Sequence, residues 1–187
     1  MVPHPANSAA GCVTPVDPAT IQYLWRYMAS ADQEMLAAAA TLVKDGRPSE
    51  GFYREQHISL GSVHKLLVHA VAAERVWLQR LTNEDPRKMI APDELPDLAS
   101  ISACWPGLHE ELLAFADRQT PDSLATILRG HNIKGIPFAL PVGAAMLHVS
   151  DHATYHRGQL NSMIKLAGGT PSAVMLYTYA ARKTAAT

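Results

Sequence analysis

The sequence predicts an all-α protein folded as a single bundle of helices. Three observations support this: four long segments place apolar residues at helical spacing, prolines and glycines separate them, and 48% of residues are hydrophobic against 18% charged. The 187 residues fit one domain. Residues 1–16, rich in Pro, Ser, Ala and Gly, are expected to form a flexible arm, which leaves 17–187 for the folded domain.

The first three long helices are predicted from their apolar periodicity. The first begins at Asp17, because Asp-Pro is typical of an N-cap followed by proline in the first turn, and runs to about Val43. The second covers 59–81, SLGSVHKLLVHAVAAERVWLQRL, and has a broad apolar stripe. The third is predicted over about 97–119. A loop is expected between the first two.

The last third of the chain combines β-favouring residues with a strongly marked fourth helix. Residues 124–140, LATILRGHNIKGIPFAL, predict a short β-hairpin or an irregular crossover. Pro141 opens the fourth helix, and the pair Gly168-Gly169 ends it as a C-cap. A short C-terminal helix over 173–183 is expected to pack across the bundle.

Composition excludes several classes of protein. Lys plus Arg (16) nearly balance Asp plus Glu (17), and no run of more than two basic residues occurs, which argues against a nucleic-acid partner. No stretch approaches the roughly 18 to 20 apolar residues that span a bilayer, and no secretory signal is recognisable at the N-terminus. The two cysteines, Cys12 and Cys104, form no recognisable framework. We therefore expect a cytoplasmic protein without a membrane partner.

Three histidines of the fourth helix indicate a metal site. His148, His152 and His156 follow one another at intervals of four, so each is rotated about 40° from the last, with a rise of about 6 Å. A neighbouring pair can bind one ion at about 2.0 to 2.1 Å, but the outer two lie about 12 Å apart. A further ligand must therefore come from another segment. The alternative is a set of solvated or hydrogen-bonded histidines without metal.

His69 is the predicted partner from the second helix. It lies in the apolar run LLVHAVAA, where an unpaired buried imidazole costs about 1 to 3 kcal/mol unless it is hydrogen bonded or bound to metal. His64 is rotated about 140° from His69 and cannot face the same point. The run HATYH is no zinc-peptidase motif, because Ala153 stands where that motif has its glutamate base.

The runs SVHKLLVHAVAAERVWLQRL, HVSDHATYHRGQL and LAGGTP together resemble the DinB-like (DinB/YfiT) superfamily of four-helix proteins. The resemblance implies an up-and-down four-helix bundle with an unusual long connection, frequent homodimers, and one divalent metal ion bound by His69, His152 and His156. Zinc or nickel is expected, with iron or manganese as alternatives. His148 is then a companion of the ligands or, alternatively, a replacement for one.

Further residues around this motif are candidates for the surroundings of the ion. Tyr155 and Gln159 are expected to orient a ligand or substrate, and Asp151 to accept an imidazole N–H. Their alternative is an ordinary surface role. Arg157 is expected either to pair with Glu74 or a substrate carboxylate, or to be a simple surface charge.

Three neutral imidazoles leave the ion positively charged, with an open position, as in catalytic zinc sites. Such a site activates water or a thiol at neutral pH. Relatives in the resembled superfamily include thiol-dependent transferases and isomerases, so the function we expect is a metal-dependent transferase that acts on a small molecule with a low-molecular-weight thiol. The alternatives are a metal-dependent hydrolase and a non-catalytic, metal-stabilised dimeric bundle.

Overall fold

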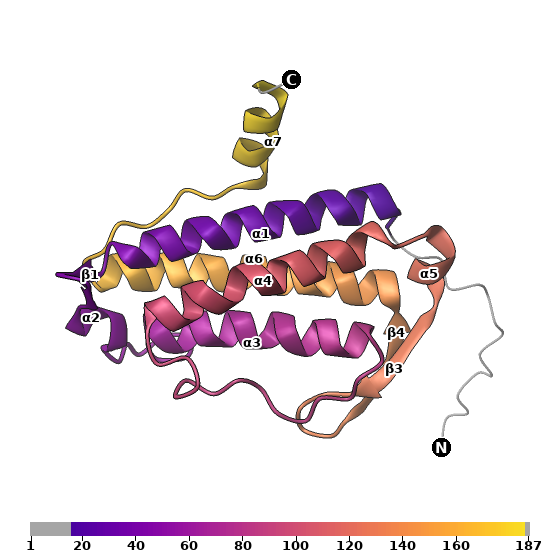
Figure 1. Ribbon diagram of the computed structural model, residues 1–187, viewed down its shortest axis with the longest axis horizontal. Coiled ribbons are helices and arrows are strands. Elements are labelled where there is room, and N and C mark those ends of the chain that lie inside the picture. The colour runs from indigo at the N-terminus through magenta and orange to yellow at the C-terminus, as the bar shows by residue number, and fades with distance from the viewer. Residues whose placement is uncertain (1–15, 186–187) are drawn as a thin grey trace, which may run out of the picture.

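The computed structural model describes residues 16–185, and four long helices form its body (Figure 1). These are α1 (Pro18–Ala40), α3 (Val63–Leu81), α4 (Leu98–Asp117) and α6 (Val142–Leu166). The all-α bundle predicted from sequence is thereby confirmed. The predicted N-terminal arm, with Cys12, lies outside the described residues except for its last position.

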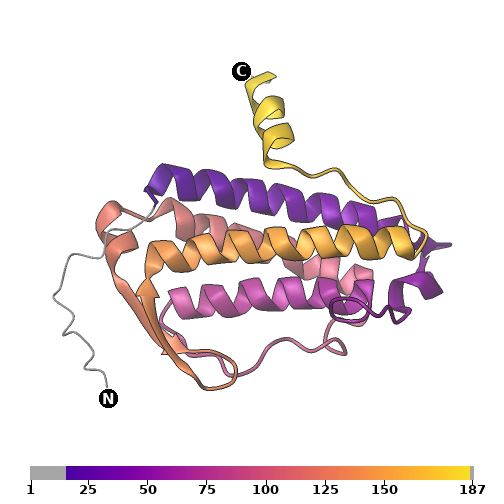
Figure 2. The same ribbon diagram turned by 180° about the vertical axis from the view of Figure 1, so that it is seen from behind.

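The long connection between α3 and α4 sets the direction of the helices. It runs back along the bundle, so that α4 starts beside the start of α3 (Figures 1 and 2). His64 Nε2 at the beginning of α3 accordingly lies 2.7 Å from the carbonyl oxygen of Leu95, just before α4. The helices α3 and α4 are therefore parallel, and α1 and α6 run in the opposite direction. Each of α1 and α3 packs against both α4 and α6.

Two small antiparallel strand pairs lie at the ends of the bundle. Strands β1 (Val43–Lys44) and β2 (Arg47–Pro48) follow α1, while β3 (Ile127–His131) and β4 (Pro137–Pro141) precede α6. The second pair is the hairpin expected within 124–140, and its strands contact α3 and α6.

Local backbone geometry explains where two helices depart from their expected limits. The first ends at Ala40 rather than Val43, because the chain turns through Asp45 (φ 50°) and Gly46 (φ 74°) into the first strand pair. The second begins after Gly61 (φ 92°) rather than at Ser59. Two short helices, α2 (Glu50–Tyr53) and α5 (Pro121–Ala125), were not predicted.

The C-terminal helix corrects an expectation. Helix α7 (Leu176–Ala185) forms, but it stands out from the bundle instead of packing across it (Figures 1 and 2). None of its residues is buried. It touches α1 through Tyr179, whose ring centroid is 5.6 Å from those of Tyr23 and Tyr27, and through an Arg182–Glu34 ion pair at 2.6 Å.

The core lies between the four long helices. Trp25 is fully buried, and its indole N–H donates to the carbonyl oxygen of Met146 at 3.0 Å, which joins α1 to α6. The largest fully buried side chains come from α1, α3, α4 and the short helices α2 and α5, namely Ile21, Trp25, Met28, Met35, Phe52, Leu66, Leu67, Ile101, Trp105, Leu108, Leu112 and Leu124. Among the described residues, no helix is both long and apolar enough to cross a bilayer.

Candidate metal centre

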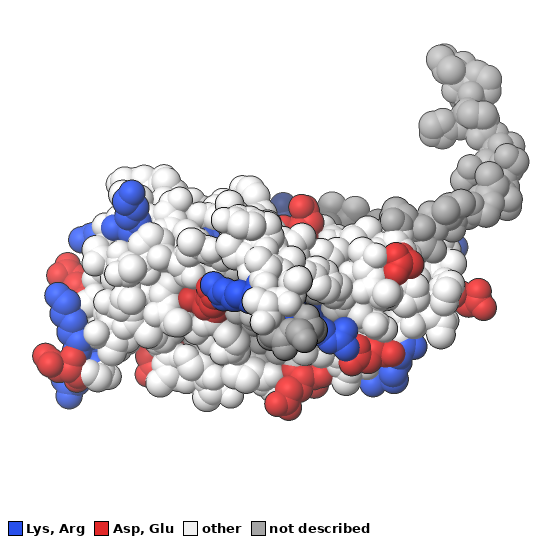
Figure 3. Space-filling model, turned by 90° about the horizontal axis from the view of Figure 1, so that it is seen from above, with Lys and Arg blue, Asp and Glu red and all other residues white. Residues whose placement is uncertain are grey.

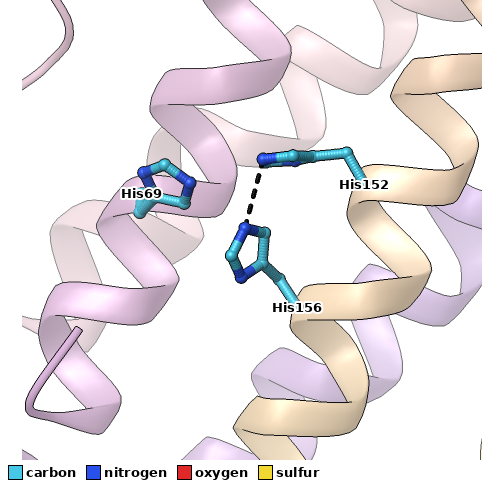
Figure 4. A group of neighbouring side chains, drawn as sticks. All are labelled: His69, His152 and His156. Carbon is cyan, nitrogen blue, oxygen red and sulfur yellow. Dashed lines mark hydrogen bonds between the residues drawn. The ribbon is translucent and has the colours of Figure 1, made fainter. Parts of the chain in front are cut away.

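The structure brings His69 of α3 together with His152 and His156 of α6 (Figure 4). One ring nitrogen from each residue can be chosen so that all three lie within 4.8 Å of one another. The ring centroids of His69 are 5.4 Å from His152 and 4.7 Å from His156. The three side chains thus converge on one point between two packed helices.

The two α6 histidines are the closest pair of the group. Their Nε2 atoms are 3.1 Å apart, because residues four positions apart lie on one helix face (Figure 4). Two imidazole nitrogens at about 2.1 Å from one ion in a tetrahedral arrangement are separated by about 3.4 Å. The observed spacing is close to that value, so the donor set fits a divalent ion that prefers nitrogen ligands.

The surroundings keep these imidazoles neutral. Burial lowers the pKa of His152 to about 4, with smaller effects from the neighbouring histidines. Burial likewise lowers the pKa of His69, aided by His156. It also lowers the pKa of His156, against the opposing effect of Gln159. At neutral pH each ring therefore has a nitrogen lone pair free for a metal ion.

Gln159 fixes the orientation of His156. Its Oε1 lies 2.8 Å from His156 Nδ1 and also accepts a hydrogen bond from Ser59 Oγ at 2.8 Å. Because a carbonyl oxygen only accepts, His156 Nδ1 carries the proton and Nε2 is left unprotonated. This is the arrangement by which outer partners orient metal-binding histidines. Ser59 was not singled out in the sequence, since it belongs to a turn far from Gln159 along the chain.

The other predicted companions lie at the edge of the group. His148 is exposed, and its ring centroid is 4.9 Å from Trp77 and 5.7 Å from His152. Tyr155 is 63% exposed, with its ring edge-on to His156 at 5.1 Å. Asp151 is also exposed, and no hydrogen bond links it to an imidazole within the described chain.

A pocket of about 260 Å³ adjoins His69. It lies between the start of α3, the turn before it and the α3–α4 connection. Most of its lining is apolar, and one ammonium group is present, which pairs with Glu55 at 2.8 Å. The lining residues are Leu60, Lys65, Val68, His69, Met89, Ile90 and Pro92.

A second group of polar side chains lies in the core of the bundle. Asp32 of α1, Glu74 of α3 and His109 of α4 are each at most 4% exposed, and their ligand atoms lie within 4.8 Å of one another. Trp105 Nε1 donates to Glu74 Oε2 at 2.8 Å. Arg157 Nη1 of α6 donates to Asp32 Oδ1 at 3.1 Å. All four long helices therefore contribute a charged or titratable side chain.

These core groups shift one another's protonation. Burial, together with the negative charge of Asp32, raises the pKa of Glu74 to about 7. Burial opposes the charged form of His109, but the carboxylates of Asp32 and Glu74 outweigh it and raise its pKa to about 9. Protonated His109 and Arg157 together balance the two carboxylates when both are ionised.

This core group was not predicted from the sequence. Arg157, expected to be a surface charge or to pair with Glu74 or a substrate carboxylate, is 7% exposed and pairs with Asp32 instead. A signal was present. Asp32, Glu74 and His109 each have apolar residues three or four positions before and after them, on the same helix face, where an unpaired charge is costly. Charged residues at buried helical positions were the sign of a shared polar cluster.

Comparison with known proteins agrees with this architecture. The DinB family model matches residues 16–185. No curated protein matches the chain. The crystal structure of a DinB-like protein from Bacillus cereus ATCC 10987 is similar, with a TM-score of 0.59, 20% identity, and coverage of 81% of this chain and 93% of that one. The match to the family model spans all of the described residues, and the chain belongs to the DinB family.

Proposed function

We propose that this protein is a metal-dependent enzyme in which His69, His152 and His156 hold one divalent ion, and that it transfers a low-molecular-weight thiol to a small electrophilic substrate. The observation behind the proposal is the convergence of three neutral imidazoles beside an apolar pocket. Zinc or nickel suits three nitrogen ligands best, and iron or manganese is the alternative.

The residues of the chain have separable tasks in this proposal. When bound, a divalent ion with three imidazole ligands lowers the pKa of a thiol or water, so that a nucleophile is present at neutral pH. Gln159 holds His156 in the tautomer that directs Nε2 toward the other two rings. Ser59 in turn holds Gln159. The geometry of the ligands is therefore set before a substrate arrives.

The pocket beside His69 is the proposed place for the non-reacting part of the substrate. Leu60, Val68 and Ile90 offer it an apolar wall, and burial of an apolar body there stabilises the complex by about 25 cal/mol per Å². Lys65 is the cation of the lining. A substrate with an apolar body matches this lining, and thiol chemistry suits a reducing compartment such as the cytoplasm.

The test compares metal-loaded protein with His152→Ala and with His57→Ala, a control at an exposed histidine. Each protein is incubated with cysteine or glutathione and simple electrophiles, and thioether formation is measured. We expect a rate that requires the metal, survives in His57→Ala and falls to background in His152→Ala. If no thiol gives a metal-dependent rate while esters or amides are hydrolysed, the protein is a metal-dependent hydrolase instead.

A homodimer is part of the proposal, and helix α7 is the observation that favours it. On the face around α1 and α7, uncharged atoms predominate and charges of both signs are scattered (Figure 3). Met175 and Tyr177 are 57% and 72% exposed. A helix that buries none of its residues in its own chain is typical of one that packs against a partner, here a second copy.

The dimer proposal is checked by the molar mass in solution of the full chain and of a chain that ends at Ser172. We expect a dimer for the first and a monomer for the second. A monomeric full chain contradicts it. A dimer that binds metal tightly, but shows no rate with any thiol or ester, identifies a non-catalytic bundle stabilised by its ion.

A further inference from the structure

We propose that Asp32, Glu74 and His109 form a second divalent-cation site, buried in the core of the bundle and distinct from the three-histidine centre. The donors are two carboxylates and one imidazole. Each comes from a different helix, so a bound ion would join α1, α3 and α4, whereas the histidine centre joins only α3 and α6. Glu74 follows His69 by five residues and is rotated about 140° from it around α3.

The distances within this group suit ligands of a common ion. His109 Nε2 lies 3.5 Å from Asp32 Oδ2 and 3.4 Å from Glu74 Oε2. A direct N–H···O hydrogen bond has a length of about 2.7 to 3.2 Å. Two ligand atoms at about 2.1 Å from one ion in a tetrahedral arrangement are about 3.4 Å apart. The imidazole thus stands too far from both carboxylates for good hydrogen bonds, at the spacing that a shared ion requires.

Unsatisfied polar atoms in the group give a second, independent indication. Asp32 Oδ2, Glu74 Oε1 and His109 Nε2 are all buried without a hydrogen-bond partner. Buried polar atoms form hydrogen bonds in the great majority of cases, and a cluster that leaves three without one calls for an explanation. A cation bound by Asp32 Oδ2, His109 Nε2 and the carboxylate of Glu74, whose Oε2 accepts from Trp105, supplies the partner that these atoms lack.

The two carboxylates are also held in place by hydrogen bonds from neighbouring side chains, as metal ligands commonly are. Arg157 binds Oδ1 of Asp32, which leaves Oδ2 free, and Thr154 Oγ1 accepts a hydrogen bond from the same guanidinium at 2.8 Å. The indole of Trp105 donates to Glu74. These contacts orient both carboxylates before an ion enters.

The charge balance of the group implies that a divalent ion and the proton of His109 exclude each other. Without metal, the proton of His109 and the guanidinium of Arg157 balance the two carboxylates. On loading, a divalent ion enters and the proton of His109 leaves to solvent, so the four side chains and the ion carry one net positive charge. Oxygen-rich donors with one imidazole suit Mn²⁺ or Fe²⁺ best, and both ions are also alternatives at the all-nitrogen centre. The proposed ligand is therefore a divalent first-row ion, with Mn²⁺ as the probe.

The experiment counts ions in the full-length protein. Metal-free protein is equilibrated with Mn²⁺, freed of excess ion, and its manganese content is measured by elemental analysis for the wild type, His152→Ala and His109→Gln. We expect two ions per chain in the wild type and one in each variant. The Mn²⁺ that remains in His152→Ala should give an electron paramagnetic resonance spectrum. This spectrum should disappear in the double variant that combines His152→Ala with His109→Gln.

Two controls keep the outcome clear. Glu111→Gln removes an exposed α4 carboxylate paired with Arg75 and should retain both ions. If His109→Gln does not fold, His152→Ala alone decides, because that substitution leaves the core group intact. No Mn²⁺ in His152→Ala would overturn the proposal and identify the cluster as an ion-pair network bridged by a proton. If the three histidines do not bind Mn²⁺, the result is different, because the wild type and His152→Ala then contain the same number of ions.

Discussion

The Nε2 atoms of His152 and His156 lie 3.1 Å apart on one face of α6, and both rings face His69 across the boundary with α3. Burial keeps these rings neutral, since a charged imidazole in this position would lose its hydration. Gln159 holds one of the two rings by its other nitrogen. The centre is therefore prepared for a cation by packing and by hydrogen bonds of the chain itself.

Removal of metal should lower the melting temperature. An ion present at about 100 times its dissociation constant stabilises a protein by about 2.7 kcal/mol, which corresponds to roughly 5 to 10 °C for a chain of this size. Calorimetry of zinc-loaded protein with and without a chelator measures this shift. We expect a smaller shift in His69→Ala and an unchanged one in His57→Ala. Equal shifts in all three proteins would show that His69 takes no part.

Replacement of Gln159 by leucine should weaken metal binding without unfolding the protein. Loss of the oxygen that accepts from His156 Nδ1 frees the ring to rotate and to change tautomer. Changes of this kind reduce metal affinity about 10- to 100-fold. Competition with a chromophoric chelator measures the affinity, and Gln33→Leu, at an exposed position of α1, is the matched control. An unchanged affinity would show that Gln159 has no part in orienting His156 for metal binding.

Replacement of Arg157 by methionine should be strongly destabilising. The change removes the guanidinium bonded to Asp32 and leaves the buried carboxylate with only the imidazolium of His109, 3.5 Å away; breaking a buried pair in this way costs about 3 to 5 kcal/mol. Arg26→Met removes an exposed pair with Asp117 and should cost at most about 1 kcal/mol. Urea unfolding of both variants compares the free energies. Equal effects would mean that the core pair contributes no more than a surface pair.

Metal-free protein should lose stability as the pH rises above neutrality. The folded-state pKa of His109 is about 9, above its ordinary value of 6.5, so folding favours its protonated form. This contribution is fully present below pH 6.5 and is lost as the pH rises through 9. It amounts to about 3 kcal/mol at most. Unfolding in chelator between pH 6.5 and 9.5 should show this loss in the wild type, and a smaller one in His109→Gln, where Glu74 with its raised pKa is the core group that still titrates.

The helices could be predicted because each carries its own local signal. Asp17-Pro18 and Gly168 mark helix ends through capping and backbone geometry, and Gly168 indeed has a φ of 87°. The pair His152 and His156 could be found because a helix fixes the relation of residues four apart. The choice of His69 rested on its apolar neighbours and on family resemblance, because spacing within one helix says nothing about another.

The core cluster and the position of α7 could not be predicted in the same way. Asp32 and Arg157 are far apart along the chain and meet only because α1 packs against α6. A lone charge in an amphipathic pattern does not reveal its partner, so the sequence left Arg157 as a surface charge or a partner of Glu74 or a substrate, and did not indicate Asp32. The apolar residues of α7 predicted that it packs against another surface, but a sequence pattern does not show which surface that is.

The sequence by itself determined the four long helices, the N-cap of α1, the glycine end of α6 and the histidine pair of α6, because these depend on contacts within a few residues. Tertiary structure alone decided that His69 meets that pair and that Ser59 donates a hydrogen bond to Gln159. It also decided that Asp32, Glu74, His109 and Arg157 meet in the core. The physical reason is that burial, pKa and metal-binding geometry depend on which helices pack together, and local periodicity does not encode that choice.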